Sequence, residues 1–492
     1  MKKFRIVSLI LLVCLGSFSC DVLDVSPTSV ITTTSFWKTQ NDAEGALNGM
    51  YVNLRNISGA IYTVGEQRSE VFEGGVYGSG RNDLNLNELS GDQPHHPDWS
   101  AFYAVVNSAN LIIKYTPAIT FKTEAAKNSF LAQAYAMRAY TYFVMTKTWG
   151  DLIIRTEPTE SSNAEITIKE RAPQTEVFTL IKSDIEKALS LFSDNSFIAG
   201  RSKWSKAAAN TLKADVFLWT GKKLNGGQAD FTTALNAIAE VEKADVSLLP
   251  NFSDLFEYAN KGNKETIMTI RYQDLDGASN NIFWLHWIID SAVPSNIDAA
   301  TKALIQPVGG GQGLLVLTEL VRKQFTEDDT RKKGSFYEIF TYDAAGKPTF
   351  YTSLSMKGRG LLTGGTRLFL SDIVLYRYAD VVLMKAEAKN ALGQDPTEEI
   401  NKVRARAYKT AYDKHVFVKG TKEFNDEAIL KERLFELVYE GKRWWDLVRF
   451  DKVFDIVPNM KSKKGQNDLL LFPIANTVLS LEPKVKQNPG YK

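Results

Sequence analysis

One long segment repeats large side chains at helical spacing, and this regularity restricts the fold more than any other feature of the sequence. In NSFLAQAYAMRAYTYFVMTKTWGD the stripe comprises Leu131, Tyr135, Arg138, Tyr142 and Met145, with small alanines between them. Spacings of three and four predict an amphipathic helix, and small residues on it let a neighbouring helix approach closely. Because Arg138 lies on an apolar stripe, we expect it to pair with a buried acid.

Further helices are predicted before residue 250. A second stripe comprises Trp204, Ala208, Leu212, Val216 and Trp219, and Gly221 offers a stop after it. Residues 176–191 and 231–243 show the same spacing. Several helices with short polar loops favour stacked helical hairpins of the tetratricopeptide type, although the consensus repeat itself is absent.

The helical pattern returns near the C-terminus. Residues 375–393 and 396–408 predict a hairpin, and AILKERLFELVYEGKRWWDLVRF (428–450) predicts one continuous amphipathic helix. Trp444 and Trp445 lie inside that pattern, so we expect them in the core. Four charged residues spaced by three and four predict a helix-stabilising ladder: Arg433, Glu436, Glu440 and Arg443.

Residues 250–370 differ from the helical blocks on either side. They contain GGGQG (309–313), which predicts a flexible turn because no Lys and Ser/Thr of a phosphate loop follow it. The alternating run FYEIFTYDAAGKPTFYTSL is broken by a glycine turn and predicts a hairpin. The expected fold is therefore mainly α, with tetratricopeptide-like helical hairpins, irregular loops and small β-hairpin insertions.

The N-terminus has the pattern of a targeting signal. Lys2, Lys3 and Arg5 precede an apolar run, Ile6 to Phe18, that is too short to span a bilayer. Cleavage after residue 19 would make Cys20 the new N-terminus. A cysteine in this position fits lipid attachment through its thiol, and two or more acyl chains anchor a protein stably to a membrane. The alternative is an ordinary cleavage site at which the cysteine is only a small residue. We expect residues 1–19 to be a lipoprotein signal and 20–35 a tether.

Composition excludes several classes of protein. The chain has 492 residues, and removal of the signal leaves 56 basic against 57 acidic residues, so no basic surface for nucleic acid is expected. The only other cysteine, Cys14, lies in the signal, so the mature chain has no internal disulfide. No second long apolar run predicts a membrane span.

Eight sequence blocks, taken in order, resemble the SusD/RagB family of outer-membrane nutrient-binding lipoproteins. They are CDVLDVSPTS, DAEGALNGMY, MRAYTYFVMTKTWGDL, GRSKWSKAAANTLKADVFL, LYRYADVVLMKAEAKN, INKVRARA, ERLFELVYEGKRWWDLVRF and the ending LFPI with QNPGY. The resemblance runs over nearly the whole chain. It implies a tetratricopeptide-containing fold with an N-terminal half at 36–250 and a C-terminal half at 251–492.

The resemblance also implies a location and a function. Family members are anchored by lipid to the outer membrane and face outward. They bind a glycan or oligosaccharide without cleaving it and present it to a SusC-type TonB-dependent transporter. No cofactor or metal is expected. The shared motifs fall on residues whose spacing assigns them to the packed core, so they do not locate the ligand.

Candidate ligand contacts come from stretches where helical periodicity fails. Sugars bind through aromatic faces that stack on the ring and through polar groups that bond its hydroxyls. One stretch supplies Trp284 and Trp287 with Asn281 beside them, and the other supplies Tyr77, Arg81 and Asn82. The alternatives are a buried helix or strand edge for the two tryptophans and a solvated loop for the second group.

Three other functions compete with glycan binding. Glu66, Glu70 and Glu73 lie in a candidate loop, but nothing in their spacing requires the carboxylate pair of a glycosidase. His95 and His96 are adjacent, which suits a surface loop better than a metal site. The serious alternative is a helical-repeat scaffold that binds a peptide or a protein in a groove.

Overall fold

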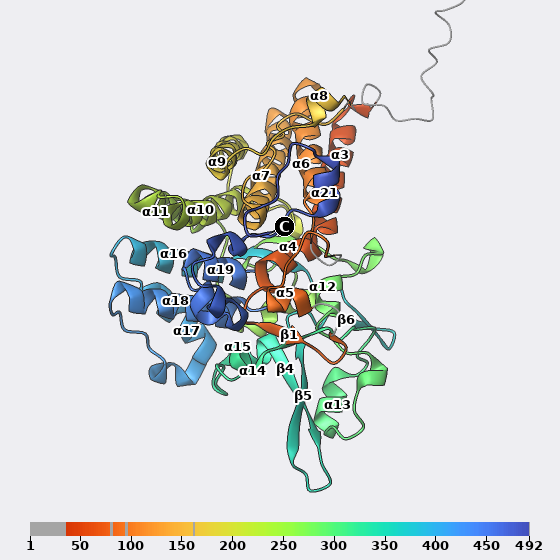
Figure 1. The fold of residues 1–492 in the computed structure, drawn as a ribbon, viewed down its shortest axis with the longest axis vertical. Helices are drawn as coiled ribbons and strands as arrows, with labels where there is room; N and C mark the ends of the chain where they lie inside the picture. The colour runs from red at the N-terminus through yellow and green to blue at the C-terminus, as the bar shows by residue number, and fades with distance from the viewer. Residues whose placement is uncertain (1–35, 79–81, 94–96, 161–162, 492) are drawn as a thin grey trace, which may run out of the picture.

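The computed structural model describes residues 36–78, 82–93, 97–160 and 163–491. As expected, the fold is mainly helical, with short two-stranded sheets (Figure 1). Within these residues, no helix combines the length and the apolar character that crossing a membrane requires. The predicted lipid-attachment residue Cys20 and the predicted ligand contact Arg81 lie outside the described residues, as do His95 and His96.

Long helices form most of the structure. In the first half they are α3 (Gln40–Asn56), α4 (Ser58–Glu66), α6 (Ser100–Tyr115), α7 (Glu124–Trp149), α9 (Gln174–Leu191), α10 (Lys206–Lys223) and α11 (Gly227–Val241). In the second half they are α16 (Tyr378–Ala391), α17 (Thr397–Tyr408), α18 (Lys422–Leu437) and α19 (Arg443–Arg449). Short helices fill the connections: α5 (Asn82–Leu86), α8 (Ala164–Thr167), α12 (Asn281–Trp284), α13 (Ala299–Ile305), α14 (Glu319–Arg322), α15 (Thr330–Ser335), α20 (Val453–Ile456) and α21 (Asn476–Leu481).

Neighbouring helices stack in chain order, as the repeat-like pattern predicts. Helix α6 packs on α3 and α7, α9 on α7 and α10, and α11 on α10 (Figure 1). The second half continues the stack, because α16 packs on α11 and carries α17 and α18. Helices α7 and α10 are buried around most of their circumference, and their alanines let the neighbouring backbones approach. Arg138 of α7 pairs with Asp184 of α9 at 2.7 Å, which confirms the expected buried acid.

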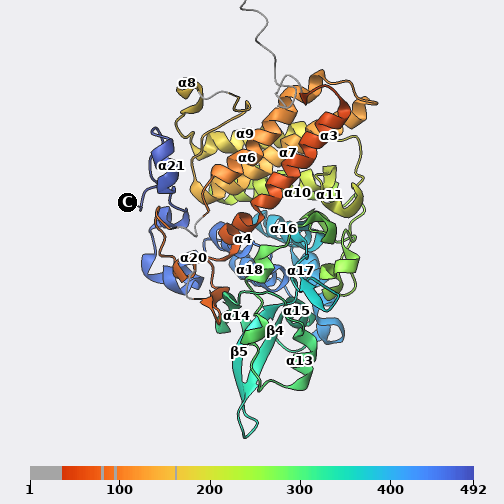
Figure 2. The same ribbon diagram turned by 90° about the vertical axis from the view of Figure 1, so that its right-hand side faces the viewer.

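The strands form antiparallel pairs outside the helical stack. They are β1 (Phe72–Gly74) with β3 (Leu315–Leu317), β2 (Thr266–Ile270) with β8 (Ile373–Arg377), β4 (Phe336–Tyr342) with β5 (Pro348–Ser355), and β6 (Leu361–Thr363) with β7 (Thr366–Leu368). The predicted hairpin is β4–β5, and its turn contains Gly346 at φ +78°. It projects at the end of the molecule opposite α3 and α6 (Figure 2).

The predicted continuous helix over 428–450 is wrong. Helix α18 ends at Leu437, and the chain turns before α19 because Tyr439 and Gly441 both take φ +69°. Gly65 of α4 packs against this turn so closely that a Cβ on it would lie 1.9 Å from the Gly441 carbonyl oxygen. The close approach buries Trp444 and Trp445, which confirms their predicted place in the core.

The predicted charge ladder is also wrong, because its members bind other elements instead of one another. Arg433 pairs with Asp380 of α16 and Asp446 of α19, and Arg443 pairs with Glu70. The remaining two residues, Glu436 and Glu440, both bind Arg377 at the end of β8, at 2.6 and 2.8 Å. Arg377 also binds Glu265 at 2.8 Å, and all four members of this cluster are at least 90% buried.

The end of α4 is joined to the last part of the chain. The Glu66 carboxylate accepts the backbone N–H groups of Tyr439, Lys442 and Arg443. Arg68, just beyond α4, donates to the carbonyl oxygens of residues 469–471 and lies 4.2 Å from the Trp444 ring centre. The two ends of the chain therefore complete one core.

Candidate functional site

A solvent-open cavity of about 440 Å³ lies beside α12, in the region of irregular structure. We call it the Trp284 pocket; it is lined by Asp274, residues 277–281, Trp284, Gly310 and residues 367–370. Trp284 is half-buried and Asn281 is exposed, so both can meet a ligand. The structure thus brings two of the residues predicted from the sequence into one concave site.

Asn280 fixes the position of α12. Its side-chain oxygen accepts the N–H of Ile282 at 3.0 Å, which caps the helix N-terminus. Its side-chain nitrogen donates to the Ser371 carbonyl oxygen at 2.7 Å, and its backbone N–H donates to Phe369 at 2.7 Å. The helix is therefore tied to the chain just after β7, which forms the opposite wall of the pocket.

The glycine-rich loop 309–313 is a packed part of the site, and the expectation of a flexible turn is corrected accordingly. Gln312 N–H donates to the Trp284 carbonyl oxygen at 2.9 Å, and Gly313 N–H donates to that of Trp287 at 2.6 Å. A Cβ on Gly311 would lie 2.1 Å from the Trp287 carbonyl oxygen, so only glycine fits there. The loop holds the backbone that carries Trp284.

The same loop brings the second predicted stretch close to the first. Tyr77 donates its backbone N–H to the Gly313 carbonyl oxygen at 3.0 Å, and its side chain is 48% exposed. Tyr77 does not line the Trp284 pocket itself. Asn82 is the first residue of α5.

Trp287 does not offer a face to the pocket. It is 1% exposed, and its indole N–H donates to the Ser355 carbonyl oxygen at 3.0 Å. The guanidinium carbon of Arg367 lies 4.1 Å from the centre of its ring. The sequence predicted that Trp287 contacts the ligand directly. The structure instead places it behind the pocket wall, where it supports Arg367.

Arg367 lines the pocket although no sequence pattern singles it out, because an arginine after a Gly-Gly turn is typical of a surface residue. Its guanidinium donates to the carbonyl oxygens of Pro307, Ile305 and Arg359. Within the described part of the chain it has no carboxylate partner within 4 Å. Burial lowers its pKa to about 10, and the neighbouring Arg359 adds to this effect. Arg367 therefore stiffens the wall and leaves the pocket an uncompensated positive charge.

The carboxylates considered as a catalytic pair have other partners. Glu66 and Glu70 are buried and bind the turn before α19 and Arg443, respectively. Burial raises the pKa of Glu66 to about 7, although three backbone N–H groups oppose the rise. Among the residues that line the Trp284 pocket, Asp274 is the one carboxylate. Nowhere in the described ranges do three or more His, Cys, Asp or Glu side chains gather as metal ligands would.

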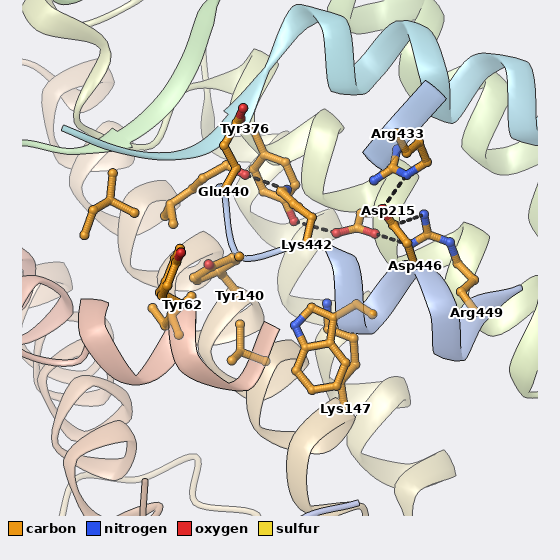
Figure 3. Close-up of a pocket in the computed structure, with 16 residues that line it drawn as sticks. Tyr62, Tyr140, Lys147, Asp215, Tyr376, Arg433, Glu440, Lys442, Asp446 and Arg449 are labelled. Atoms are coloured by element: carbon orange, nitrogen blue, oxygen red, sulfur yellow. Dashed lines mark hydrogen bonds and ion pairs between the residues drawn. The ribbon is translucent and has the colours of Figure 1, made fainter. Parts of the chain in front are cut away.

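A second, smaller cavity lies at the junction of the two halves of the stack (Figure 3). It has a volume of about 40 Å³, room for only one or two water molecules, so no sugar ring fits it. Its walls carry the ion pairs of Asp446 and Arg449 together with Lys147. Lys147 lies over the rings of Phe143, Trp219 and Trp445 at 3.9, 5.5 and 5.1 Å.

Replacement of Lys147 by methionine is expected to stabilise the protein at neutral pH by roughly 1–3 kcal/mol. Burial lowers the pKa of Lys147 to about 8, so the folded protein at pH 7 keeps a charge in a poorly solvated place. The unfolded chain binds more protons between this value and about pH 10, so wild-type stability rises with pH in that window. The gain should therefore shrink as the pH approaches 10.

Thermal melts at pH 7 and pH 10 measure this effect. Lys419→Met removes an exposed lysine and serves as the matched control. Lys357, whose pKa burial also lowers to about 8, should leave part of the pH dependence in place. If Lys147→Met is less stable than wild type at pH 7, the attraction of the Lys147 ammonium to the three rings outweighs the cost of removing its charge from water.

Comparison with known proteins places the whole fold in one family. A SusD family model matches residues 364–491, and a model described as starch-binding and associating with the outer membrane matches residues 21–218. The structure is similar to NanU of B. fragilis, at 34% identity and a TM-score of 0.84, over 95% of this chain and 100% of that one. A SusD superfamily protein from Bacteroides vulgatus is 33% identical, with a TM-score of 0.82, over 93% of this chain and 100% of that one. SusD-like protein P38 of Formosa agariphila is 29% identical over the full length of both chains. This chain belongs to the SusD family.

Proposed function

We propose that this protein is a non-catalytic lipoprotein of the cell surface that binds a glycan or oligosaccharide in the Trp284 pocket. It would deliver that ligand to a SusC-like TonB-dependent transporter in the outer membrane. The observation that carries the proposal is the partly exposed Trp284 at the wall of a 440 Å³ pocket, with Asn281 and Asp274 beside it. An aromatic face for the sugar ring and polar groups for its hydroxyls are the two elements that sugar recognition needs.

Each candidate residue has a distinct role in this proposal. Trp284 stacks on a sugar ring, and Asn281 donates and accepts hydrogen bonds with its hydroxyls. Tyr77 bonds to loop 309–313, so it extends the binding face for a ligand longer than one sugar. Arg81 and Asn82, which follow it in the sequence, stay predicted contacts. Trp287 acts from behind the wall by holding Arg367 in place.

Two observations support binding without cleavage. A glycosidase needs two carboxyl groups across the scissile bond, and Asp274 stands alone among the lining residues. The matched family model is described by starch binding, with no reaction in its description.

Calorimetric titration of the protein lacking residues 1–19 tests the proposal. The panel contains neutral glucans, mannans, uronic acid oligosaccharides and sialylated glycans, with unrelated peptides alongside them. We expect saturable heat with at least one glycan class. The uronic acid oligosaccharides and sialylated glycans test whether the uncompensated positive charge of Arg367 favours acidic ligands. Binding to the peptides alone would favour the scaffold alternative, and release of reducing ends during incubation would overturn the non-catalytic assignment.

Replacement of Cys20 by alanine tests the proposed anchor. The mature variant should bind the same glycan with unchanged affinity, because Cys20 is not among the residues proposed to contact the ligand. It should be lost from the outer-membrane fraction, since the acyl chains supply the stable attachment. Fractionation is compared with a Ser19→Ala control in cells that lack the transporter. Retention of the Cys20→Ala protein in those membranes would contradict the lipoprotein assignment.

A further inference from the structure

A second surface site is formed where the β1 region meets α14 and the C-terminal segment. Two cavities of about 450 and 490 Å³ meet at Glu70 and Leu320, which line both. They share no lining residue with the Trp284 pocket. We call the pair the Glu70 groove, with an acid arm that reaches Glu73 and Glu319 and a lysine arm that reaches Lys431 and Lys461.

Buried polar atoms in the groove are left without partners. One oxygen of Glu70 accepts two hydrogen bonds from Arg443, at 2.9 and 2.6 Å. Its other oxygen, and both polar atoms of the Asn85 side chain, have no hydrogen-bond partner among the described residues. Glu70 is 97% and Asn85 91% buried. An unsatisfied buried group is destabilising, so a ligand in the acid arm that reached these atoms would stabilise the site.

The acid arm favours a positive charge. Glu70, Glu73 and Glu319 contribute three carboxylates to it, and none of its lining residues is basic. Burial raises the pKa of the Glu73 carboxyl and Glu319 raises it further, while Arg322 opposes both effects. Arg443 pairs with Glu70 and Lys323 with Glu319, so Glu73 is the carboxylate of this arm that has no ion-pair partner among the described residues. A bound cation would relieve the repulsion between Glu73 and Glu319.

The remaining surface of the acid arm suits an aliphatic chain. Leu86, Leu320, Val457 and Pro458 line it, and Leu86 and Leu320 are 40% and 51% exposed. Lysine and arginine lay their alkyl stems on such surfaces while their charged heads meet polar groups. Phe72 is the one aromatic residue that lines either arm, and it is 3% exposed. The groove therefore offers no aromatic face to a sugar ring.

We propose that the Glu70 groove binds an extended segment of a protein partner, with a lysine or arginine side chain in the acid arm and an acidic residue in the lysine arm. The free oxygen and nitrogen of the Asn85 amide match the N–H and C=O of one peptide unit. Two acids, Glu427 and Asp455, also line the lysine arm, and they pair with Lys452 and Lys464, respectively. Lys431 and Lys461 form no ion pair within the described ranges, so they can meet a carboxylate of the partner. This surface is separate from glycan binding and gives the protein a second specificity.

Saturation-transfer NMR with small blocked amino acids tests the acid arm in the mature protein. The probes are Nα-acetyl-lysine N-methylamide, the corresponding norleucine compound, which lacks the charge, and free lysine. The blocked lysine should bind at least about tenfold more tightly than the norleucine compound, since only it places a charge among the carboxylates. It should also bind at least as tightly as free lysine, because a chain segment presents no free termini.

Charge-reversal variants locate the binding. Glu73→Lys and, separately, Glu319→Lys should weaken the blocked lysine by about tenfold or more, since each replaces an exposed carboxylate by a cation. Glu44→Lys on α3, an exposed acid remote from the groove, should leave binding within about twofold, and Trp284→Ala should do the same.

The lysine arm is tested with the peptides Ac-Lys-Leu-Gly-Asp-NH₂ and Ac-Lys-Leu-Gly-Asn-NH₂. The aspartate peptide should bind several-fold more tightly, and Lys461→Ala should abolish the difference. If the blocked lysine and the norleucine compound bind equally tightly, the charge does not contribute and the groove is only an apolar patch. Tighter binding of free lysine would make it a small-molecule site, and no signal from any probe would mean that only water occupies it. Each of these outcomes overturns the proposal.

Discussion

Replacing Trp284 by alanine is expected to weaken binding of the best glycan by about 30-fold, or roughly 2 kcal/mol. The residue is the aromatic face of the 440 Å³ pocket, and alanine leaves a sugar ring with only polar contacts there. The pocket should keep its shape, since α12 is held by the hydrogen bonds of Asn280 rather than by the indole. Calorimetric titration of wild type and variant measures the difference.

Two control variants separate this effect from damage to the fold. Trp37→Ala removes a tryptophan that stacks on Tyr115, far from the pocket, and should bind as wild type does. Trp284→Phe keeps an aromatic face and should recover part of the affinity. If Trp284→Ala binds the glycan as tightly as wild type and melts at the same temperature, the ligand lies elsewhere on the protein.

Replacing Arg377 by methionine is expected to lower the free energy of unfolding by about 3–5 kcal/mol. Its guanidinium joins Glu265, Glu436 and Glu440, and the residue is fully buried. Removal of the cation leaves these carboxylates crowded in the core, with Arg406, Lys357 and Arg331 as their remaining cationic partners. Denaturant unfolding at pH 7 measures the loss.

Arg359→Met is the matched control for Arg377→Met. Arg359 pairs with Glu257 at 2.6 Å, and both side chains are more than a third exposed. An exposed ion pair contributes about 0–1 kcal/mol, so this variant should unfold close to wild type. Equal losses in the two variants would contradict the central role of the buried cluster.

Sequence patterns predicted the parts of the fold in which burial follows periodicity. Helices α7 and α10 were visible because alanines and large apolar residues alternate at helical spacing along them. The sequence predicted that Arg138 pairs with an acid, since a guanidinium on an apolar stripe needs one. It did not identify that acid as Asp184, because this depends on how α9 packs.

The break between α18 and α19 was not predictable in the same way. Apolar spacing continues across it, and only the backbone angles of Tyr439 and Gly441 interrupt the helix. Those angles are imposed by packing on Gly65, which is nearly four hundred residues away in the sequence. For the same reason the charges near the break looked like a ladder on one helix, although they bind other elements and not one another.

The candidate site was predicted only in part. Trp284 and Trp287 were equivalent in the sequence, because both lie in one aromatic-rich stretch. Their roles separate only when α12 ends after a single turn and the Ser355 carbonyl oxygen takes the indole N–H of Trp287. The position of Arg367 depends on β6–β7, whose short strands have no distinctive pattern.

The contacts of Glu66 and Arg68 have a consequence for the order in which the chain can fold. A chain made from its N-terminus presents α4 early, and the Glu66 carboxylate and the Arg68 guanidinium have their partners at residues 439–443 and 469–471. Until those residues emerge, both charges stay hydrated and α4 cannot enter the core. The segment from residue 439 onward therefore acts as the closing step of folding, and a chain that stops before it leaves α4 without these partners.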